Sequence, residues 1–168
     1  MLWAMSTCSL VVLPDPGSVL RADLVAALLA TSTPILDLAG IATGPAPLAS
    51  SICAAIREAR VAHPLLIVAT GAGLPLLPAV ARAQRAAHHL ICGYVLLDVD
   101  AHALEADPTG ESWPDAPVTL IESTVLIATD DADAVQTHAR LRGWTVRAGE
   151  QPEVLASALL ALATDLTP

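Results

Sequence analysis

Acidic side chains recur where short apolar runs of this chain end. Carboxyl groups gathered in one cleft could bind a cationic substrate or act as general acids and bases. His102 could serve as a base oriented by Asp100 or Asp130. The alternative is that each aspartate caps a helix or shapes a turn, a common role for Asp after a strand. The polar residues that would share this cleft are Asp15, Asp37, Thr70, Asp98, Asp100, His102, Asp130 and Asp131.

Short apolar runs alternate with longer alanine-rich stretches of helical periodicity, a pattern typical of parallel βαβ units. The predicted strands are Ser9–Leu13, Ile35–Leu38, Leu65–Ala69, Leu90–Leu97, Thr124–Ala128 (with Val118 as an alternative start) and Trp144–Arg147. The predicted helices are Val19–Ala30, Leu48–Ala59, Leu77–Ala87, Ala132–Leu141 and Pro152–Ala163. We therefore expect residues 1–168 to form a single α/β domain with a mostly parallel, doubly wound sheet. Ligands in such sheets bind at the carboxyl ends of the strands, where the acidic residues fall.

Composition excludes several classes of function. The chain has 168 residues, a net charge of −9 and no lysine, which argues against binding nucleic acid or an anionic membrane surface. Its longest apolar runs are far shorter than the ~20 residues of a membrane-spanning helix. We expect a bacterial protein located in the cytoplasm. Cys8, Cys53 and Cys92 are widely spaced in apolar surroundings, which predicts buried, reduced thiols rather than disulfides.

The order of several motifs resembles that of the α/β-hydrolase superfamily. The central resemblance is Leu66–Gly73, which is similar to the strand and nucleophile elbow with the motif G-x-S-x-G. The resemblance implies a capless member, since the chain between Asp98 and Val118 is too short for a cap domain. Further segments resemble other parts of the family pattern. Leu10–Gly17 resembles the first long strand with its oxyanion loop, Asp37–Gly40 the D-x-x-G turn and Gly93–Asp98 the strand after the elbow helix. Thr129–Asp131 resembles the acid-bearing turn, and Arg142–Val146 the strand before the histidine loop.

The departures from this family pattern bear on chemistry. Gly71 stands at the nucleophile position and has no side chain to acylate. Thr70 comes one residue early, and we expect its side chain to point away from the apex of the turn. The segment Ala148–Pro152 carries no histidine, and Asp15 replaces the His-Gly of the oxyanion loop, where a carboxylate would repel a developing oxyanion. Hydrolysis by a Ser-His-Asp triad is therefore not expected.

Two functions from different classes remain. The first is a non-hydrolytic tailoring enzyme of a bacterial biosynthetic pathway, a role that the resemblance implies. It would cyclise, isomerise or epimerise a small molecule or peptide, with Asp15, His102 and Asp130 transferring protons. The second is a catalytically inactive module that binds a ligand or a partner. We favour the enzyme, because a pure scaffold has no need of aspartates at its strand ends. The pocket is predicted to be lined by Pro14, Gly17, Thr70, Gly71, Ala72, Asp98, Asp100 and Trp113.

Neither a cofactor nor a metal ion is expected. Gly71-Ala72-Gly73 lacks the third glycine and the distal acid of a dinucleotide fingerprint, and no spacing matches a zinc site. His88-His89 ends a predicted helix, where partial positive charge suits the helix dipole. An alanine- and leucine-rich surface without a cap predicts self-association, most simply as a twofold-symmetric homodimer.

Overall fold

The computed structural model describes residues 8–41, 48–99, 116–122, 129–147 and 151–166, with the side chains of 129–132 outside that description. Six described strands form one parallel sheet in the order β2-β1-β3-β4-β5-β6, which confirms the predicted fold class. The strands are β1 (Ser9–Val12), β2 (Ile35–Asp37), β3 (Leu65–Thr70), β4 (Ile91–Leu97), β5 (Val118–Ile121) and β6 (Thr145–Arg147). The helices are α1 (Val19–Leu29), α2 (Leu48–Ala59), the 3₁₀ helix η1 (Gly71–Leu76), α3 (Leu77–Ala86), α5 (Thr129–Leu141) and α6 (Pro152–Asp165).

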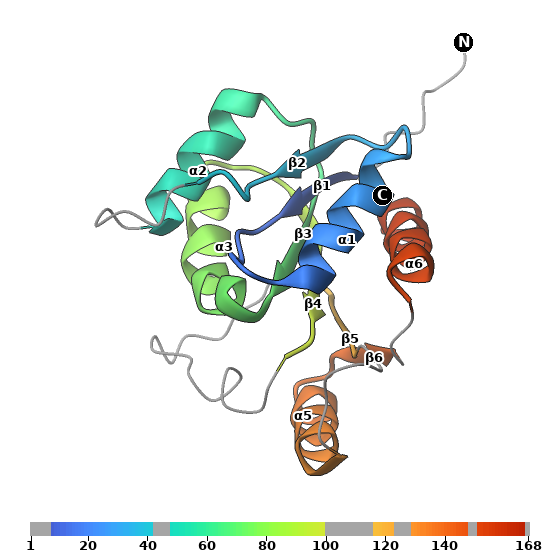
Figure 1. Cartoon of the computed structure of the whole chain (residues 1–168). Helices are drawn as coiled ribbons and strands as arrows, with labels where there is room; N and C mark the ends of the chain where they lie inside the picture. The colour runs from blue at the N-terminus through green and yellow to red at the C-terminus, as the bar shows by residue number, and fades with distance from the viewer. Residues whose placement is uncertain (1–7, 42–47, 100–115, 123–128, 148–150, 167–168) are drawn as a thin grey trace.

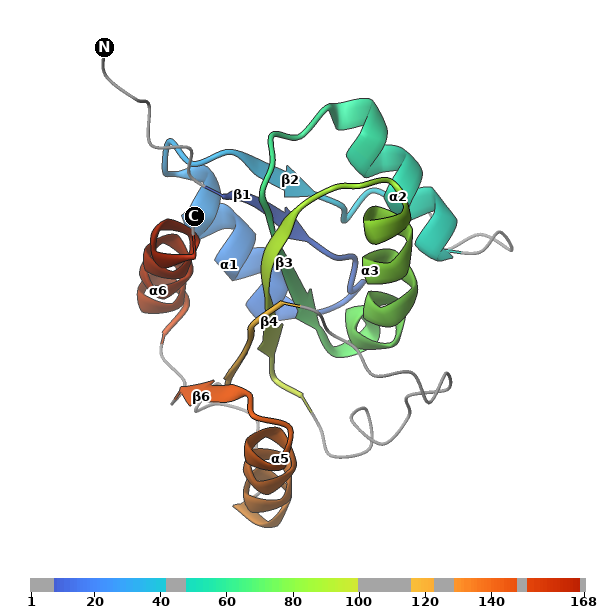
Figure 2. The ribbon, with the colours of Figure 1, turned by 180° about the vertical axis from the view of Figure 1, so that it is seen from behind.

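The sheet lies between two hydrophobic cores. Successive side chains of a strand point to opposite faces, so the buried strand β3 serves both cores. Leu65 and Ile67 pack in the core that α2, α3 and α5 cover, whereas Leu66 and Val68 pack in the core under α1 and α6. Figures 1 and 2 show α1 and α6 on one side of the sheet and α2 and α3 on the other. This two-sided burial explains why the central strands β3 and β4 are nearly continuous apolar runs, whereas the edge strand β6 alternates between exposed polar residues and Val146.

The structure corrects the sequence prediction on the C-terminal side of β4. The strand that pairs with both β4 and β6 is Val118–Ile121, as the alternative start at Val118 allowed. The predicted strand 124–128 lies outside the described residues. Helix α5 begins at Thr129, three residues before the predicted start, so Asp130 belongs to its first turn instead of to a turn before the helix. Two short apolar runs follow each other here, and periodicity alone does not tell which of them enters the sheet.

The strand order reverses between β1 and β3. From β1 the chain crosses to β2 on one side, and β3 then pairs on the other side of β1. In open α/β sheets the helical connections diverge at such a point and leave a crevice at the carboxyl ends of the two strands. Asp15 follows β1 and Gly71 follows β3, so the fold brings both residues to this crevice.

Candidate functional site

A hydrogen bond joins the two strand ends at this crevice. Thr70, the last residue of β3, is buried, and its Oγ1 donates to Oδ2 of the half-buried Asp15 at 2.7 Å. The backbone brings them together, because the amide of Leu13 donates to the carbonyl of Val68 and extends the β1–β3 ladder by one residue. Thr70 therefore does not point away from the turn as expected from the sequence, since the carboxylate of Asp15 accepts its hydroxyl.

The same carboxylate lies beside the turn at Gly71, which is itself exposed. Gly71 has φ +22°, in the region that disfavours side chains. A Cβ built on Gly71 would lie 2.9 Å from Oδ2 of Asp15, closer than a Cβ can stand without a shift of the neighbouring atom. A Cβ on Gly73 would lie 3.2 Å from the Cβ of Leu13, so the turn packs closely against the chain leaving β1. The space in which a nucleophile on this turn would extend is thus occupied by a carboxylate.

A buried arginine organises the neighbouring strand ends. Arg21 of α1 donates from Nε to the carbonyl of Leu13 at 2.7 Å and from Nη2 to that of Val12 at 3.4 Å. Nη2 also forms an ion pair with Oδ1 of Asp37, at the end of β2. Oδ1 of Asp37 further accepts from the amide of Ala39 at 2.9 Å. Asp37 thus has a structural role, and the charge of Arg21 is compensated by Asp37 instead of Asp15.

Two further acidic residues lie along the same edge. In the register of the sheet, Thr70 pairs with Leu97 and Leu97 with Ile121. Gly71, Asp98 and Glu122 are therefore the first residues beyond the paired ends of β3, β4 and β5. Asp98 is half-buried with φ +47°, and its amide donates to the carbonyl of Ile121 at 3.4 Å.

Glu122 is a site residue that sequence analysis missed. It is 9% exposed, and its Oε2 accepts from Nε2 of Gln136 in α5 at 2.8 Å. Gln136 in turn accepts from Nη2 of Arg140 at 2.9 Å. The usable signal was the acidic residue directly after the run 118–121, but we expected the strand to end at Ala128. With the strand ending at Ile121, Glu122 takes the place predicted for the acid of the next turn.

Other predicted site residues are only partly placed. Pro14 is buried, whereas Gly17, two residues after Asp15, and Ala72, directly after Gly71, are exposed. Asp100, His102 and Trp113 lie outside the described residues, as does the side chain of Asp130. The structure therefore brings Asp15, Thr70 and Gly71 together and leaves the roles of His102 and Asp130 as predictions.

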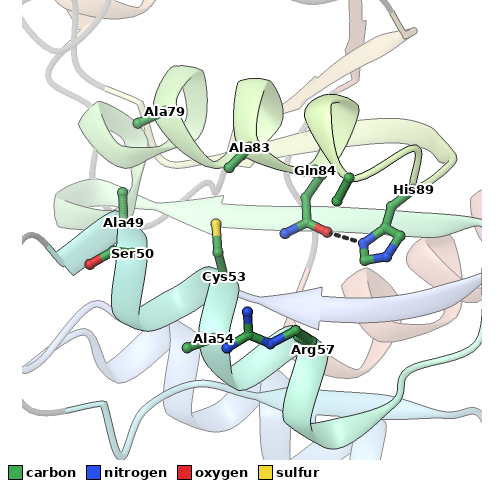
Figure 3. A pocket seen from close by; sticks show the side chains of 10 residues that line it. Ala49, Ser50, Cys53, Ala54, Arg57, Ala79, Ala83, Gln84 and His89 are labelled. Carbon is green, nitrogen blue, oxygen red and sulfur yellow. Dashed lines mark hydrogen bonds between the residues drawn. The ribbon is translucent and has the colours of Figure 1, made fainter.

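A separate pocket of about 520 Å³ lies between α2 and α3. Figure 3 shows Cys53 of α2 pointing toward α3, and Gln84 bonded to His89 beyond the end of α3. Burial raises the pKa of the Cys53 thiol, with the nearby Gln84 amide opposing this shift. Half of the lining residues are alanine, and none of the predicted site residues is among them. The residues lining it are Ala49, Ser50, Cys53, Ala54, Arg57, Ala79, Ala83, Gln84, Ala87 and His89.

Two further features, a metal-binding cluster and a membrane-spanning helix, are absent from the described residues. Among them, no group of three or more His, Cys, Asp or Glu side chains is arranged to hold a metal ion. None of their helices has both the length and the apolar character needed to cross a membrane.

Comparison with solved structures decides the fold family. RedJ superposes with a TM-score of 0.62 at 14% identity, over 95% of this chain and 92% of RedJ. The Vlm2 thioesterase domain gives 0.61 at 11% identity, over 92% and 93% of the two chains. BorB, a type II thioesterase from the borrelidin cluster, gives 0.57 at 17% identity, over 96% and 92%. The chain has the α/β-hydrolase fold.

These similarities are structural. No family model matches the chain, and no curated protein matches it in sequence. Identities of 11–17% establish the α/β-hydrolase fold alone. Within that fold, Thr70–Gly73 is the strand-to-helix turn that the sequence resemblance identified as the elbow.

Proposed function

We propose that this α/β-hydrolase-fold protein is a non-hydrolytic enzyme that cyclises, isomerises or epimerises a small molecule or peptide. One observation carries the proposal: the carboxylate of Asp15, held by Thr70, stands over Gly71 where an acylating side chain would extend. A glycine offers no atom for a covalent acyl intermediate. A carboxylate at the same place can remove and return a proton.

The geometry suits Asp15 to act as a general base. Its Oδ2 accepts from Thr70, while Oδ1 has no donor among the described residues. A fixed carboxylate with one free oxygen can take a proton from a C–H, N–H or O–H bond of a substrate. In an isomerisation the proton moves to Oδ1 and returns to another substrate atom. The reaction consumes no water and no oxidant.

The structural neighbours support a role in biosynthesis. A structure of RedJ is described as the thioesterase of the prodiginine pathway in Streptomyces coelicolor, and BorB belongs to the borrelidin cluster. The Vlm2 thioesterase domain is bound with a dodecadepsipeptide. We propose by analogy that this chain acts on a small molecule or peptide of a biosynthetic pathway. The missing hydroxyl at Gly71 is the reason why we do not extend thioester hydrolysis to it.

Hydrogen exchange with solvent tests the proposal directly. Purified protein is incubated in D₂O with extract from a strain that lacks its gene, and mass spectrometry follows deuterium incorporation into the pathway compound. We expect incorporation with the wild type, its loss with Asp15→Asn, and no change with the exposed control Asp23→Asn. Unchanged incorporation with a folded Asp15→Asn protein would refute Asp15 as the base, and no incorporation with the wild type beyond that of extract alone would leave a ligand-binding module as the function. Labelling of the wild type by a fluorophosphonate would contradict the non-hydrolytic assignment.

A further inference from the structure

Glu122 contains a buried oxygen that no described group satisfies. The side chain is 9% exposed, and its Oε2 accepts from Gln136. Its Oε1 is buried and has no hydrogen-bond partner among the described residues. Buried polar atoms in folded proteins almost always have a partner, so an orphaned carboxylate oxygen calls for an explanation such as a ligand.

No described residue supplies this carboxylate with a compensating cation. Arg140 donates to Gln136 and not to Glu122, and the bond that the structure gives between Arg147 and Glu122 joins backbone atoms, the carbonyl of Arg147 accepting from the amide of Glu122 at 3.3 Å. The ion pair that the structure describes at this edge joins Arg21 to Asp37. Removing a charge from water without an opposite charge costs free energy, and a bound cationic group would offset that cost.

The position of Glu122 relates it to the proposed proton-transfer group. Gly71 lies under the carboxylate of Asp15, and Glu122 lies at the same level of the sheet two strands away. Adjacent strands are separated by about 4.8 Å, which places the backbone of Glu122 roughly 10 Å from that of Gly71. The two carboxylates therefore belong to strand ends two places apart along one edge of the sheet.

We propose that Glu122 binds a protonated amine of the substrate through Oε1, and so fixes the substrate with its reacting atoms at Asp15. The inference rests on the proposed function and names its substrate class: small molecules or peptides that carry a primary or secondary amine. Glu122 is then a binding and positioning residue. Gln136 donates to the other oxygen, Oε2.

Titration with benzylamine tests the binding step, with benzyl alcohol as the neutral analogue of the same shape. Amide resonances of the ¹⁵N-labelled full chain report affinity and location. We expect benzylamine to shift resonances at Asp98 and Glu122, and Glu122→Gln to weaken its binding at least tenfold. Benzyl alcohol should bind weakly and equally to both proteins. Glu153→Gln, at an exposed site in α6, is the matched control and should bind as the wild type does.

Thermal melting separates this role from a purely structural one. The amide oxygen introduced by Glu122→Gln could still accept from Gln136, so we expect this variant to melt no lower than the wild type. A lower melting temperature with unchanged benzylamine affinity would overturn the proposal and make Glu122 a support for α5. Should Glu122→Gln fail to fold, Gln136→Leu provides the second test: it keeps the charge and should retain benzylamine binding, and loss of binding in this folded variant would count against the proposal.

The two proposals can fail separately. Deuterium exchange into the pathway compound depends on Asp15, whereas benzylamine affinity depends on Glu122. Exchange without amine binding would overturn the amine site alone. Amine binding without exchange would overturn the enzymatic function and leave an amine-binding module.

Discussion

The hydroxyl of Thr70 and the carboxylate of Asp15 meet across the gap between two parallel strands, at a hydrogen-bond distance of 2.7 Å. The contact fixes a negative charge directly above the turn after β3. In an α/β-hydrolase that forms an acyl-enzyme, this region must accept a side-chain hydroxyl and a developing oxyanion. A carboxylate there would oppose both, and the contact therefore supports our proposal of a non-hydrolytic function.

Replacing Gly71 by serine is expected to destabilise the protein without creating a hydrolase. The positive φ disfavours any side chain, and the new Cβ would press against Oδ2 of Asp15. Backbone strain of this kind costs about 1–3 kcal/mol. Urea unfolding measures the loss, and fluorophosphonate labelling checks for hydrolase activity.

A double-mutant cycle isolates the contact from the backbone strain. In an Asp15→Ala background, Gly71→Ser should cost less, because the carboxylate that it meets is gone. Equal costs in the two backgrounds would show that Asp15 does not occupy the space above Gly71.

Arg21→Met should destabilise the fold by about 3 kcal/mol, the low end for breaking a buried ion pair. The low end applies because Asp37 is 34% exposed and water can solvate it once the arginine is removed. The carbonyls of Val12 and Leu13 lose donors at the same time. Denaturant unfolding is the measurement, with Arg57→Met on the exposed surface of α2 as a control expected within about 0.5 kcal/mol of wild type. Similar losses in both variants would refute the structural role of Arg21.

His89 makes stability sensitive to acid. Burial, and then the neighbouring His63, lower the pKa of His89, whose ring centroid lies 4.3 Å from that of His63. A histidine with a lowered pKa binds fewer protons in the folded state, so its stabilising contribution is lost as the pH falls below about 6.5. Melting temperatures between pH 7.5 and 5 should fall less steeply for His89→Gln than for wild type or for the control His138→Gln.

The raised pKa values of two thiols should affect both their rate of alkylation and the stability of the fold at high pH. Burial raises the pKa of Cys53 and, more strongly, that of Cys92, whose Sγ donates to the carbonyl of Leu65 at 3.2 Å. Both side chains are half-buried, in contrast to the predicted full burial, which only Cys8 shows. Thiolates are scarce at neutral pH when the pKa is raised, so iodoacetamide should modify both more slowly than N-acetylcysteine. Because the folded state retains these protons, stability should decline above about pH 9; rapid labelling of Cys92 at pH 7 would contradict this prediction.

The architecture could be predicted because the strands are buried on both faces. Runs such as Leu65–Thr70 lie between two layers of helices and therefore contain almost no polar residue. Parallel strands place all their carboxyl ends at one edge, which is why Asp15, Thr70 and Gly71 could be assigned to one site. Their hydrogen bond could not be predicted, because Asp15 and Thr70 are 55 residues apart in the chain. The sequence of neither segment indicates that β1 and β3 are neighbours in the sheet.

Glu122 and Arg21 show where prediction from sequence stopped. Glu122 was missed because we expected the strand after β4 to end at Ala128 and not at Ile121. The acidic residue at the strand end differs between these two positions. Arg21 was missed because arginines in helices usually point to solvent, whereas this one lies under the ends of β1 and β2. In both cases tertiary contacts decided the role of a charged residue.

The strictly parallel pairing of the described strands also affects how the chain folds. No two of them can form a hairpin, and Leu10 of β1 finds its neighbour Leu66 only after more than fifty intervening residues have been synthesised. Long loops must close, with a loss of conformational entropy, before the contacts between strands can stabilise the fold. Refolding should therefore take milliseconds to seconds. During translation β1 emerges from the ribosome well before β3, one of its two neighbours in the sheet. Chaperone binding at β1 would protect the nascent chain from aggregation.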